Sequence, residues 1–504
     1  MLLLKNGLVV DGSGNPPFHG PVLIDEGMIA EVDIHAVGDC PSMDCSGLAI
    51  APGFIDLHSH RDLQALDGGA EKLRQGVTGE VVGNCGFSPF PFDGDPRTLQ
   101  EFASGILGKP DGWGWSNASN YLRAVETQST KMNVFPLVGH GSLRVAVAGQ
   151  SQRALSSLEL DRVAGLLDDA LSSGCCGFST GLMYAPGSGA TKEELERLCR
   201  IVARRHKLYA THMRSYSAGL VDAVREQLDL ARATGCRLQI SHLQAAGRSN
   251  WHLQQQALDE IEMANRQGVD VEFDIYPYQC GSTVLTQWLP AWALEGGKAA
   301  LLERLSDKAT RSKIAREMDR TSPQSWSDIT ISGVGTAKNA ELPGKTIADI
   351  ASARTTDPAE CALDLLVEEE ASVNVVSFNQ SRENLRQLLT HPLCSVISDG
   401  FHVKGKAHPR LYGTFPELLG NVTRDRGWLS LSEAVHKITS KPARRIGLVN
   451  RGLVTSGHCA DLTIFDPAAI QSHSTYEDPD REPEGIVAVV KDGGVVYGRG
   501  EWAA

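Results

Sequence analysis

The chain has 504 residues, of which 41% are hydrophobic and 22% charged, and its formal net charge is −13. No apolar run approaches the roughly 20 residues that a membrane-spanning helix requires, so we expect no membrane partner. A protein that binds nucleic acid normally carries a basic stripe that neutralises phosphates, and the acidic charge therefore disfavours a nucleic-acid partner.

Residues 1–52 contain short β-like segments separated by glycine, aspartate and proline turns. The first 14 residues, MLLLKNGLVVDGSG, lack the longer apolar region and the cleavage site of a signal peptide. Eleven cysteines are scattered without a C-x-x-C pair, which does not resemble a disulfide framework. We therefore expect a cytoplasmic protein whose cysteines are mostly buried thiols, and the sequence carries no signal of its oligomeric state.

From residue 53 to 451, β-rich segments alternate with amphipathic helical patterns. This alternation predicts an α/β fold, a (β/α)₈ TIM-like barrel rather than an open doubly wound sheet. Nine candidate strands compete for eight places, and we interpret 373–378 as the irregular one. The candidates are residues 53–58, 78–85, 132–139, 176–181, 207–214, 237–244, 269–276, 373–378 and 394–400.

Two further parts complete the predicted architecture. Between about 284 and 350 the alternation stops, which predicts an inserted, mostly helical subdomain that could cover the barrel mouth as a lid. Residues 452–504 return to β-like segments, with a hairpin turn at Asp492-Gly-Gly. Because neither end of the chain is large enough for a good core, we predict that 1–52 and 452–504 pair into one small β-sandwich.

Metal-capable side chains stand where several of these strands end. A lone His-x-His pair is more often a hydrogen-bonded structural pair, but active sites of such barrels lie at the C-terminal ends of the strands. The co-occurrence of six such residues at the ends of five β-like segments predicts a metal site at the barrel mouth. They are His58, His60, Cys85, His212, His242 and Asp399.

Imidazole and thiolate ligands favour Zn²⁺, whereas Mg²⁺ and Ca²⁺ prefer oxygen ligands. Bound zinc lowers the pKa of a water ligand to about 7 and polarises a carbonyl oxygen, which amide hydrolysis at neutral pH requires. Asp399 would take the proton of that water and pass it to the leaving nitrogen. The alternative is a turn-forming aspartate before a glycine.

With these residues the sequence resembles the N-acyl-D-amino-acid deacylases, or D-aminoacylases, of the amidohydrolase superfamily over almost the whole chain. The most specific matching stretches are GNCG, STGLMYAPG and HPRLYGTFP, beside the generic HxH and SDG. The resemblance implies that the tight zinc is held by Cys85, His212 and His242. It also implies a weaker second site formed by His58 and His60, which share Cys85, and it makes Asp399 the catalytic acid and base.

The resemblance further assigns Arg410 and Tyr278 to the carboxylate of the substrate, by a bidentate guanidinium contact and a phenol hydrogen bond. Two positions depart from the family pattern. Gln244 replaces a lysine that helps to bind this carboxylate in many members, and Tyr216 stands where the family commonly has an acid.

These residues predict a zinc-dependent amidohydrolase that cleaves a linear N-acyl amide, first of all an N-acyl-D-amino acid, to a carboxylate and a free amine. Its partner would be a small-molecule amide. Alternatives are a cyclic amidase similar to hydantoinases and dihydroorotases, a hydrolase of an amide that lacks a free α-carboxylate, and a deaminase. A metal-stabilised binding protein is the alternative without catalysis.

Overall fold

A computed structural model describes residues 1–33, 40–92, 95–108, 113–128 and 131–502. Its central feature is a sheet of eight parallel strands, in the order β18-β14-β13-β12-β11-β10-β9-β8. A parallel bridge between Ser59 and Gly400 brings the two outer strands together, so the barrel nearly closes. The strands are β8 (Phe54–Asp56), β9 (Val77–Val82), β10 (Asn133–Gly139), β11 (Gly177–Gly181), β12 (Leu208–His212), β13 (Arg237–Ile240), β14 (Val271–Ile275) and β18 (Cys394–Val396).

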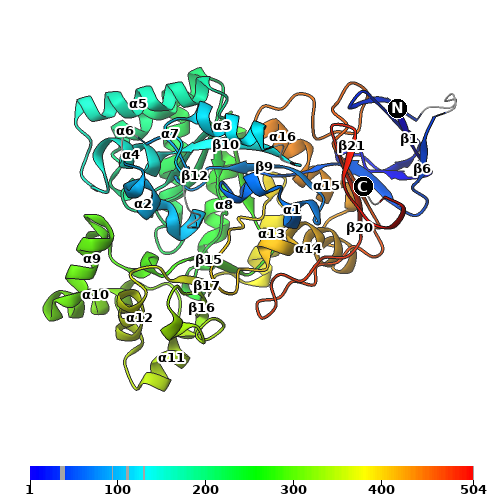
Figure 1. The fold of residues 1–504 in the computed structure, drawn as a ribbon. Coiled ribbons are helices and arrows are strands. Elements are labelled where there is room, and N and C mark those ends of the chain that lie inside the picture. Colours follow the sequence, from blue (N-terminus) through cyan, green and yellow to red (C-terminus); the bar gives the residue numbers. More distant parts are fainter. Residues whose placement is uncertain (34–39, 93–94, 109–112, 129–130, 503–504) are drawn as a thin grey trace.

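Helices surround this barrel, as Figure 1 shows for α3 to α8. They form because apolar residues recur at helical spacing; α6, for example, buries Leu195, Leu198 and Val202 and is capped by the Thr191 hydroxyl. The predicted (β/α)₈ barrel is therefore confirmed. The helices are α1 (Ala70–Leu73), α2 (Arg97–Leu107), α3 (Ala118–Thr127), α4 (His140–Ala148), α5 (Ser157–Ser172), α6 (Lys192–Arg204), α7 (Leu220–Thr234), α8 (Leu253–Arg266), α13 (Arg382–Thr390), α14 (Arg410–Glu417), α15 (Leu431–Ile438) and α16 (Ser440–Arg445).

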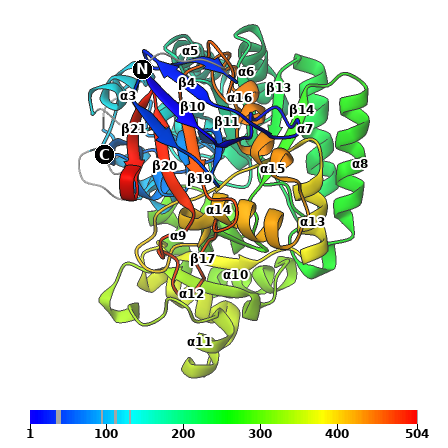
Figure 2. The same cartoon turned by 90° about the vertical axis from the view of Figure 1, so that its right-hand side faces the viewer.

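Both ends of the chain build one small β domain beside the barrel (Figures 1 and 2). One sheet has the order β5-β4-β1-β6, and the other, β21-β20-β19-β7-β2-β3, combines strands from both ends. A separate apolar core between them confirms the predicted sandwich, while its boundaries at residues 52 and 452 stay a prediction. The strands are β1 (Leu2–Lys5), β2 (Leu8–Val9), β3 (Phe18–His19), β4 (Val22–Asp25), β5 (Met28–Val32), β6 (Ser42–Asp44), β7 (Ala49–Pro52), β19 (Leu462–Phe465), β20 (Ile486–Lys491) and β21 (Gly494–Gly498).

An inserted subdomain separates β14 from β18 in the sequence and has its own apolar core. It contains an antiparallel sheet in the order β15-β17-β16 in addition to its helices. Candidate strand 373–378 lies in this sheet and outside the barrel, so the inserted elements reach beyond residue 350. The elements are β15 (Cys280–Val284), α9 (Gly297–Ser306), α10 (Lys308–Thr321), β16 (Ile329–Gly333), α11 (Ile347–Arg354), α12 (Pro358–Glu368) and β17 (Asn374–Phe378). Across the described ranges, no helix is both long and apolar enough to cross a membrane.

Candidate active site

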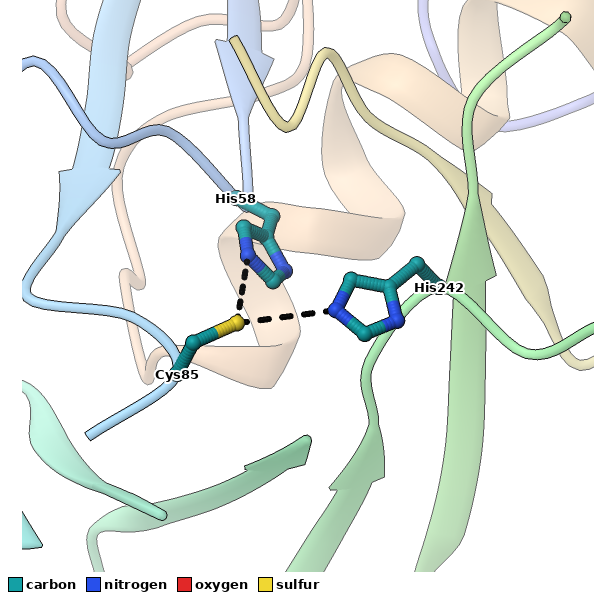
Figure 3. Close-up of side chains that lie close together, drawn as sticks. All are labelled: His58, Cys85 and His242. Atoms are coloured by element: carbon teal, nitrogen blue, oxygen red, sulfur yellow. Dashed lines mark hydrogen bonds between the residues drawn. The ribbon is translucent and has the colours of Figure 1, made fainter. Parts of the chain in front are cut away.

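Two groups of metal-capable side chains meet at the C-terminal ends of the barrel strands. In the first, Cys85 Sγ lies 3.4 Å from His58 Nε2 and 3.5 Å from His242 Nε2 (Figure 3). In the second, Asp399 Oδ1 lies 3.3 Å from Nε2 of both His58 and His60. The candidate ligand atoms of each group lie within 4.8 Å of one another, and all these residues are buried. His58 belongs to both groups.

His212 stands next to the first group rather than within it. Its Nδ1 lies 3.1 Å from His242 Nε2, and its ring centroid is 4.7 Å from that of His242. The structure therefore brings together all six residues that the sequence singled out at the strand ends.

The nitrogen, sulfur and oxygen atoms in each of these two groups lie close enough together to bind a metal ion. The Nε2 atoms of His58 and His60 are only 3.4 Å apart. The nitrogens that converge on Cys85 and Asp399 are Nε2 of His58, His60 and His242, and on the other side of its ring His58 Nδ1 lies 3.8 Å from Asp274 Oδ1. Imidazoles, a thiol and a carboxylate that converge in this way suit a zinc-like cation. The residues present fit the predicted metal.

Three of these side chains come from backbone in the left-handed region, with φ of 53° at Cys85, 36° at His242 and 50° at Asp399. Residues other than glycine adopt this conformation rarely, and it persists only where the surroundings enforce it. The His242 amide donates to Asp274 Oδ1 at 2.7 Å, and the Asp399 amide donates to the His58 carbonyl at 2.8 Å. These bonds hold His242 and Asp399 in the turns that point their side chains into the barrel mouth.

Glycine is required beside the Cys85 loop. A Cβ atom at Gly83 would lie 2.1 Å from the Leu137 carbonyl oxygen, and one at Gly181 would lie 2.1 Å from the Cys85 carbonyl oxygen. Backbone therefore touches backbone directly around the thiol. This close contact fixes the position of Cys85 between β9 and β11.

Arg410 dominates the electrostatics of the site. Its Nη1 lies 3.0 Å from Asp399 Oδ2, its Nη2 donates to the Ser282 carbonyl at 3.3 Å, and the guanidinium stands 4.5 Å above the Tyr276 ring. Burial favours the neutral form of Asp399, but Arg410 and His58 hold its pKa well below the usual value. The carboxyl group is therefore ionised and can accept a proton.

Burial also determines the charge of two imidazoles, those of His242 and His212. It lowers the pKa of His242 to about 4 and that of His212 well below its usual value. Both rings are therefore neutral near pH 7 and keep a lone pair that a metal ion can use.

The predicted substrate-binding residues divide into two sets. Arg410 and Gln244 line a cavity of about 220 Å³ that also contains His60, Cys85, His212, His242 and Asp399. Gln244 contacts the Tyr276 hydroxyl at 3.3 Å. The structure places Tyr278 outside this cavity, with its ring 5.2 Å from that of His408. Tyr276, two residues earlier, lines the cavity beside Arg410, while the substrate-binding role of Tyr278 stays a prediction.

Tyr216, the second departure from the family pattern, supports the neighbouring loops. Its hydroxyl accepts from the Met213 amide at 2.9 Å and donates to the Ser241 carbonyl at 3.0 Å. Tyr216 thus joins the chain that follows β12 to the chain that follows β13, beside His212 and His242.

Sequence reasoning assigned no role to several residues at the site, although Tyr184 lies within the matching stretch STGLMYAPG. The Tyr184 ring lies 4.7 Å from that of His212 and lines the cavity. Below the site, the buried Lys72 ammonium donates to Asp56 Oδ2 at 2.6 Å and to the Ser398 hydroxyl at 2.7 Å, which joins β8 to the residue before Asp399. These partners are distant in sequence, so strand and helix periodicity could not identify them.

Several known proteins are similar to this chain over nearly its full length. The sequence pattern of the amidohydrolase family matches residues 42–497. An N-acyl-D-glutamate deacylase of Alcaligenes xylosoxydans xylosoxydans is 33% identical over 98% of this chain and 93% of its own length. An N-acyl-D-aspartate deacylase of the same organism is 32% identical over 98% of this chain and 91% of its own length.

A solved structure is also similar to this chain. The N-acyl-D-glutamate deacylase of Bordetella bronchiseptica, crystallised with zinc and a phosphonate that mimics the tetrahedral intermediate, superposes with a TM-score of 0.84 at 32% identity. The match covers 98% of this chain and 96% of that chain. The resemblance seen in the sequence is thereby confirmed, and the chain belongs to the amidohydrolase family, in its D-aminoacylase branch.

Proposed function

We propose that the protein hydrolyses the amide of an N-acyl-D-amino acid, or of a related linear N-acyl compound, to a carboxylate and a free amine. The observation that carries this proposal is the ion pair of Asp399 with Arg410 beside the four histidines and Cys85. It puts a proton acceptor and a carboxylate-binding cation in one buried cavity. The activities of the similar deacylases support the same reaction.

The residues present can be assigned to two metal positions. Cys85, His212 and His242 would hold one zinc ion tightly, and His58 and His60 would form a weaker second position that shares Cys85. Zinc bound there supplies Lewis-acid polarisation of the amide carbonyl and a water ligand of lowered pKa.

Asp399 moves the proton in this proposal. Its carboxylate is ionised and lies at the cavity wall, where it accepts the proton of the attacking water and delivers it to the leaving nitrogen. Arg410 binds the α-carboxylate of the substrate. Its side chain lines the cavity beside Asp399, and a guanidinium can bind a carboxylate through two nitrogens.

The remaining lining of this cavity indicates which side chains the amino acid carries. Arg410 is the one lysine or arginine among the described lining residues, while Gln244, Gln287, Gln324 and Asn379 contribute carboxamides. A second carboxylate would therefore be desolvated without a matching cation. We propose an uncharged amino-acid side chain, in contrast to the acidic substrates named for the relatives.

A mass-spectrometric screen tests the proposal. Zinc-loaded protein would be incubated with N-acetyl-D- and N-acetyl-L-amino acids, including aspartate and glutamate, and with hydantoins and dihydroorotate. We expect hydrolysis of D-amino-acid derivatives with neutral side chains. Turnover of only the cyclic amides would replace the proposal by a cyclic amidase, and release of ammonia from a heterocycle would identify a deaminase.

A further inference from the structure

A second and larger cavity, of about 440 Å³, adjoins the one at the metal-capable residues. The two cavities share four lining residues, Ile106, Met183, Tyr184 and Gln287. The second cavity lies between α2 of the barrel and α9 of the inserted subdomain, which face each other in Figure 1. The proposed reaction at Asp399 and Arg410 does not use this space.

A row of aromatic rings connects the two cavities. The centroid distances are 4.7 Å from His212 to Tyr184, 5.0 Å from Tyr184 to Phe87, and 4.8 Å from Phe87 to Phe102. Phe87 belongs to a buried apolar cluster that includes Cys85 and Ile106, another residue of the cavity wall. A row of ring contacts thus leads from His212, a candidate metal ligand, to Phe102 of α2.

Four charged residues line the second cavity, Arg97, Glu101, Lys298 and Glu370, and all four are at exposed positions. The Lys298 ammonium lies 2.6 Å from Glu370 Oε2, and the two side chains are 42% and 71% exposed. An ion pair this accessible forms a solvated rim. The second cavity therefore combines an apolar wall with a polar opening, as sites for amphipathic or apolar ligand groups do.

The proposed chemistry determines which part of the substrate enters this space. The leaving nitrogen must stand at Asp399 and the α-carboxylate at Arg410, so the acyl group extends away from both. Tyr276 and Ser282, which contact Arg410, are not among the described residues that line the second cavity. Tyr184, next to His212, belongs to both cavities.

We propose that the second cavity binds the acyl group of the substrate, and that this group is a medium-chain fatty acyl chain rather than acetyl. This inference rests on the proposed function and specifies its substrate class. Hydrolysis breaks the bond between the acyl carbon and nitrogen, water supplies the new oxygen of the fatty carboxylate, and the nitrogen leaves as an amine after it gains a proton. Apolar contacts along the acyl chain would strengthen transition-state binding and raise kcat/KM.

The test compares N-acetyl-, N-butanoyl- and N-octanoyl-D-methionine on the zinc-loaded protein. Because each buried methylene contributes favourably, we expect kcat/KM to rise about tenfold or more from acetyl to octanoyl. Ser104, a half-buried residue of α2 in the cavity wall, provides the variant. Ser104→Trp should fill the cavity and abolish the preference for the longer chain. Thr98→Trp, at an exposed position of the same helix outside the wall, is the matched control and should keep that preference.

Calorimetric binding of octanoate and acetate to the same zinc-loaded proteins separates two kinds of failure. If no N-acyl-D-amino acid is hydrolysed, yet octanoate binds about tenfold more tightly than acetate and Ser104→Trp removes the difference, the proposed function fails and the apolar site stands. If the acyl series is hydrolysed with equal kcat/KM, or if Ser104→Trp and Thr98→Trp behave alike, the second cavity is not the acyl site.

Discussion

The barrel mouth and the inserted subdomain enclose the same cavity with different chemistry. The barrel contributes ionisable side chains on short, constrained loops, such as Cys85, His242 and Asp399. The inserted subdomain, which has a core of its own, contributes uncharged side chains such as Gln287 and Trp288. This contrast supports a division in which the barrel carries out the proposed reaction and the inserted subdomain, together with barrel residues such as Gln244, determines which substrates fit.

The largest effect that would test this division is expected at Asp399. Asp399→Asn keeps the size and the left-handed backbone preference but cannot accept a proton, so kcat should fall on the order of 10² or more. Steady-state kinetics on the best substrate of the screen would measure it, with thermal unfolding as the control for folding. A kcat near that of the unaltered protein would remove Asp399 from the reaction.

Arg410→Ala should mainly raise KM for substrates with an α-carboxylate. A desolvated charged hydrogen bond contributes roughly 1.5–3 kcal/mol, which corresponds to about 10- to 150-fold in affinity. The comparison is between N-acetyl-D-methionine and its methyl ester, which lacks the negative charge. If the acid loses no more than the ester, Arg410 does not bind the carboxylate.

Cys85→Ser should weaken zinc retention and activity together, each by about tenfold, because a hydroxyl is a poorer zinc ligand than a thiolate. The purified protein should carry about one tightly held zinc per chain, which metal analysis after dialysis would show. Cys459→Ser, at a cysteine in the terminal sandwich region, is the matched control. Equal zinc content in the two variants would show that the thiol is not a ligand.

Gln244→Lys adds a cation to the barrel side of the cavity. If the substrate has an α-carboxylate, the added cation should improve KM for simple N-acyl-D-amino acids several-fold. If the natural substrate has no carboxylate, the variant buries an unpaired cation and activity should drop. Measuring kcat/KM on N-acetyl-D-methionine and on the best hit of the screen distinguishes these results.

The smallest effect is expected where the inserted subdomain touches the barrel. The Glu295 carboxylate accepts from the Gln152 amide at 3.0 Å and from the Ser151 hydroxyl at 3.4 Å. Glu295→Gln weakens both bonds, and we expect a loss of about 0.5–1 kcal/mol of substrate-binding free energy. This loss corresponds to a KM about two- to fivefold higher, with kcat unchanged. A fall in kcat without a change in KM would contradict the division between reaction and fit.

Sequence periodicity could predict the barrel because its strands are buried on both faces and end in conspicuous polar residues. It could not assign 373–378, since the same apolar pattern suits an antiparallel strand whose partners lie far away in the sequence. It could not show that Tyr276 rather than Tyr278 lines the cavity, because the Tyr278 amide donates to the Tyr276 carbonyl at 2.9 Å and the chain turns at Pro277. The side-chain alternation of a strand does not continue through such a turn.

The terminal sandwich has a consequence for the order in which the protein can fold during synthesis. β7 pairs with β2 on one side and with β19 on the other, so the strands made first are hydrogen-bonded to strands made near the end. At typical rates of translation, Pro52 waits roughly 20–80 s for its partner Leu462. Throughout this interval the edge of β7 that β19 will cover is open, and a nascent chain would need a chaperone or rapid completion of the barrel to protect it.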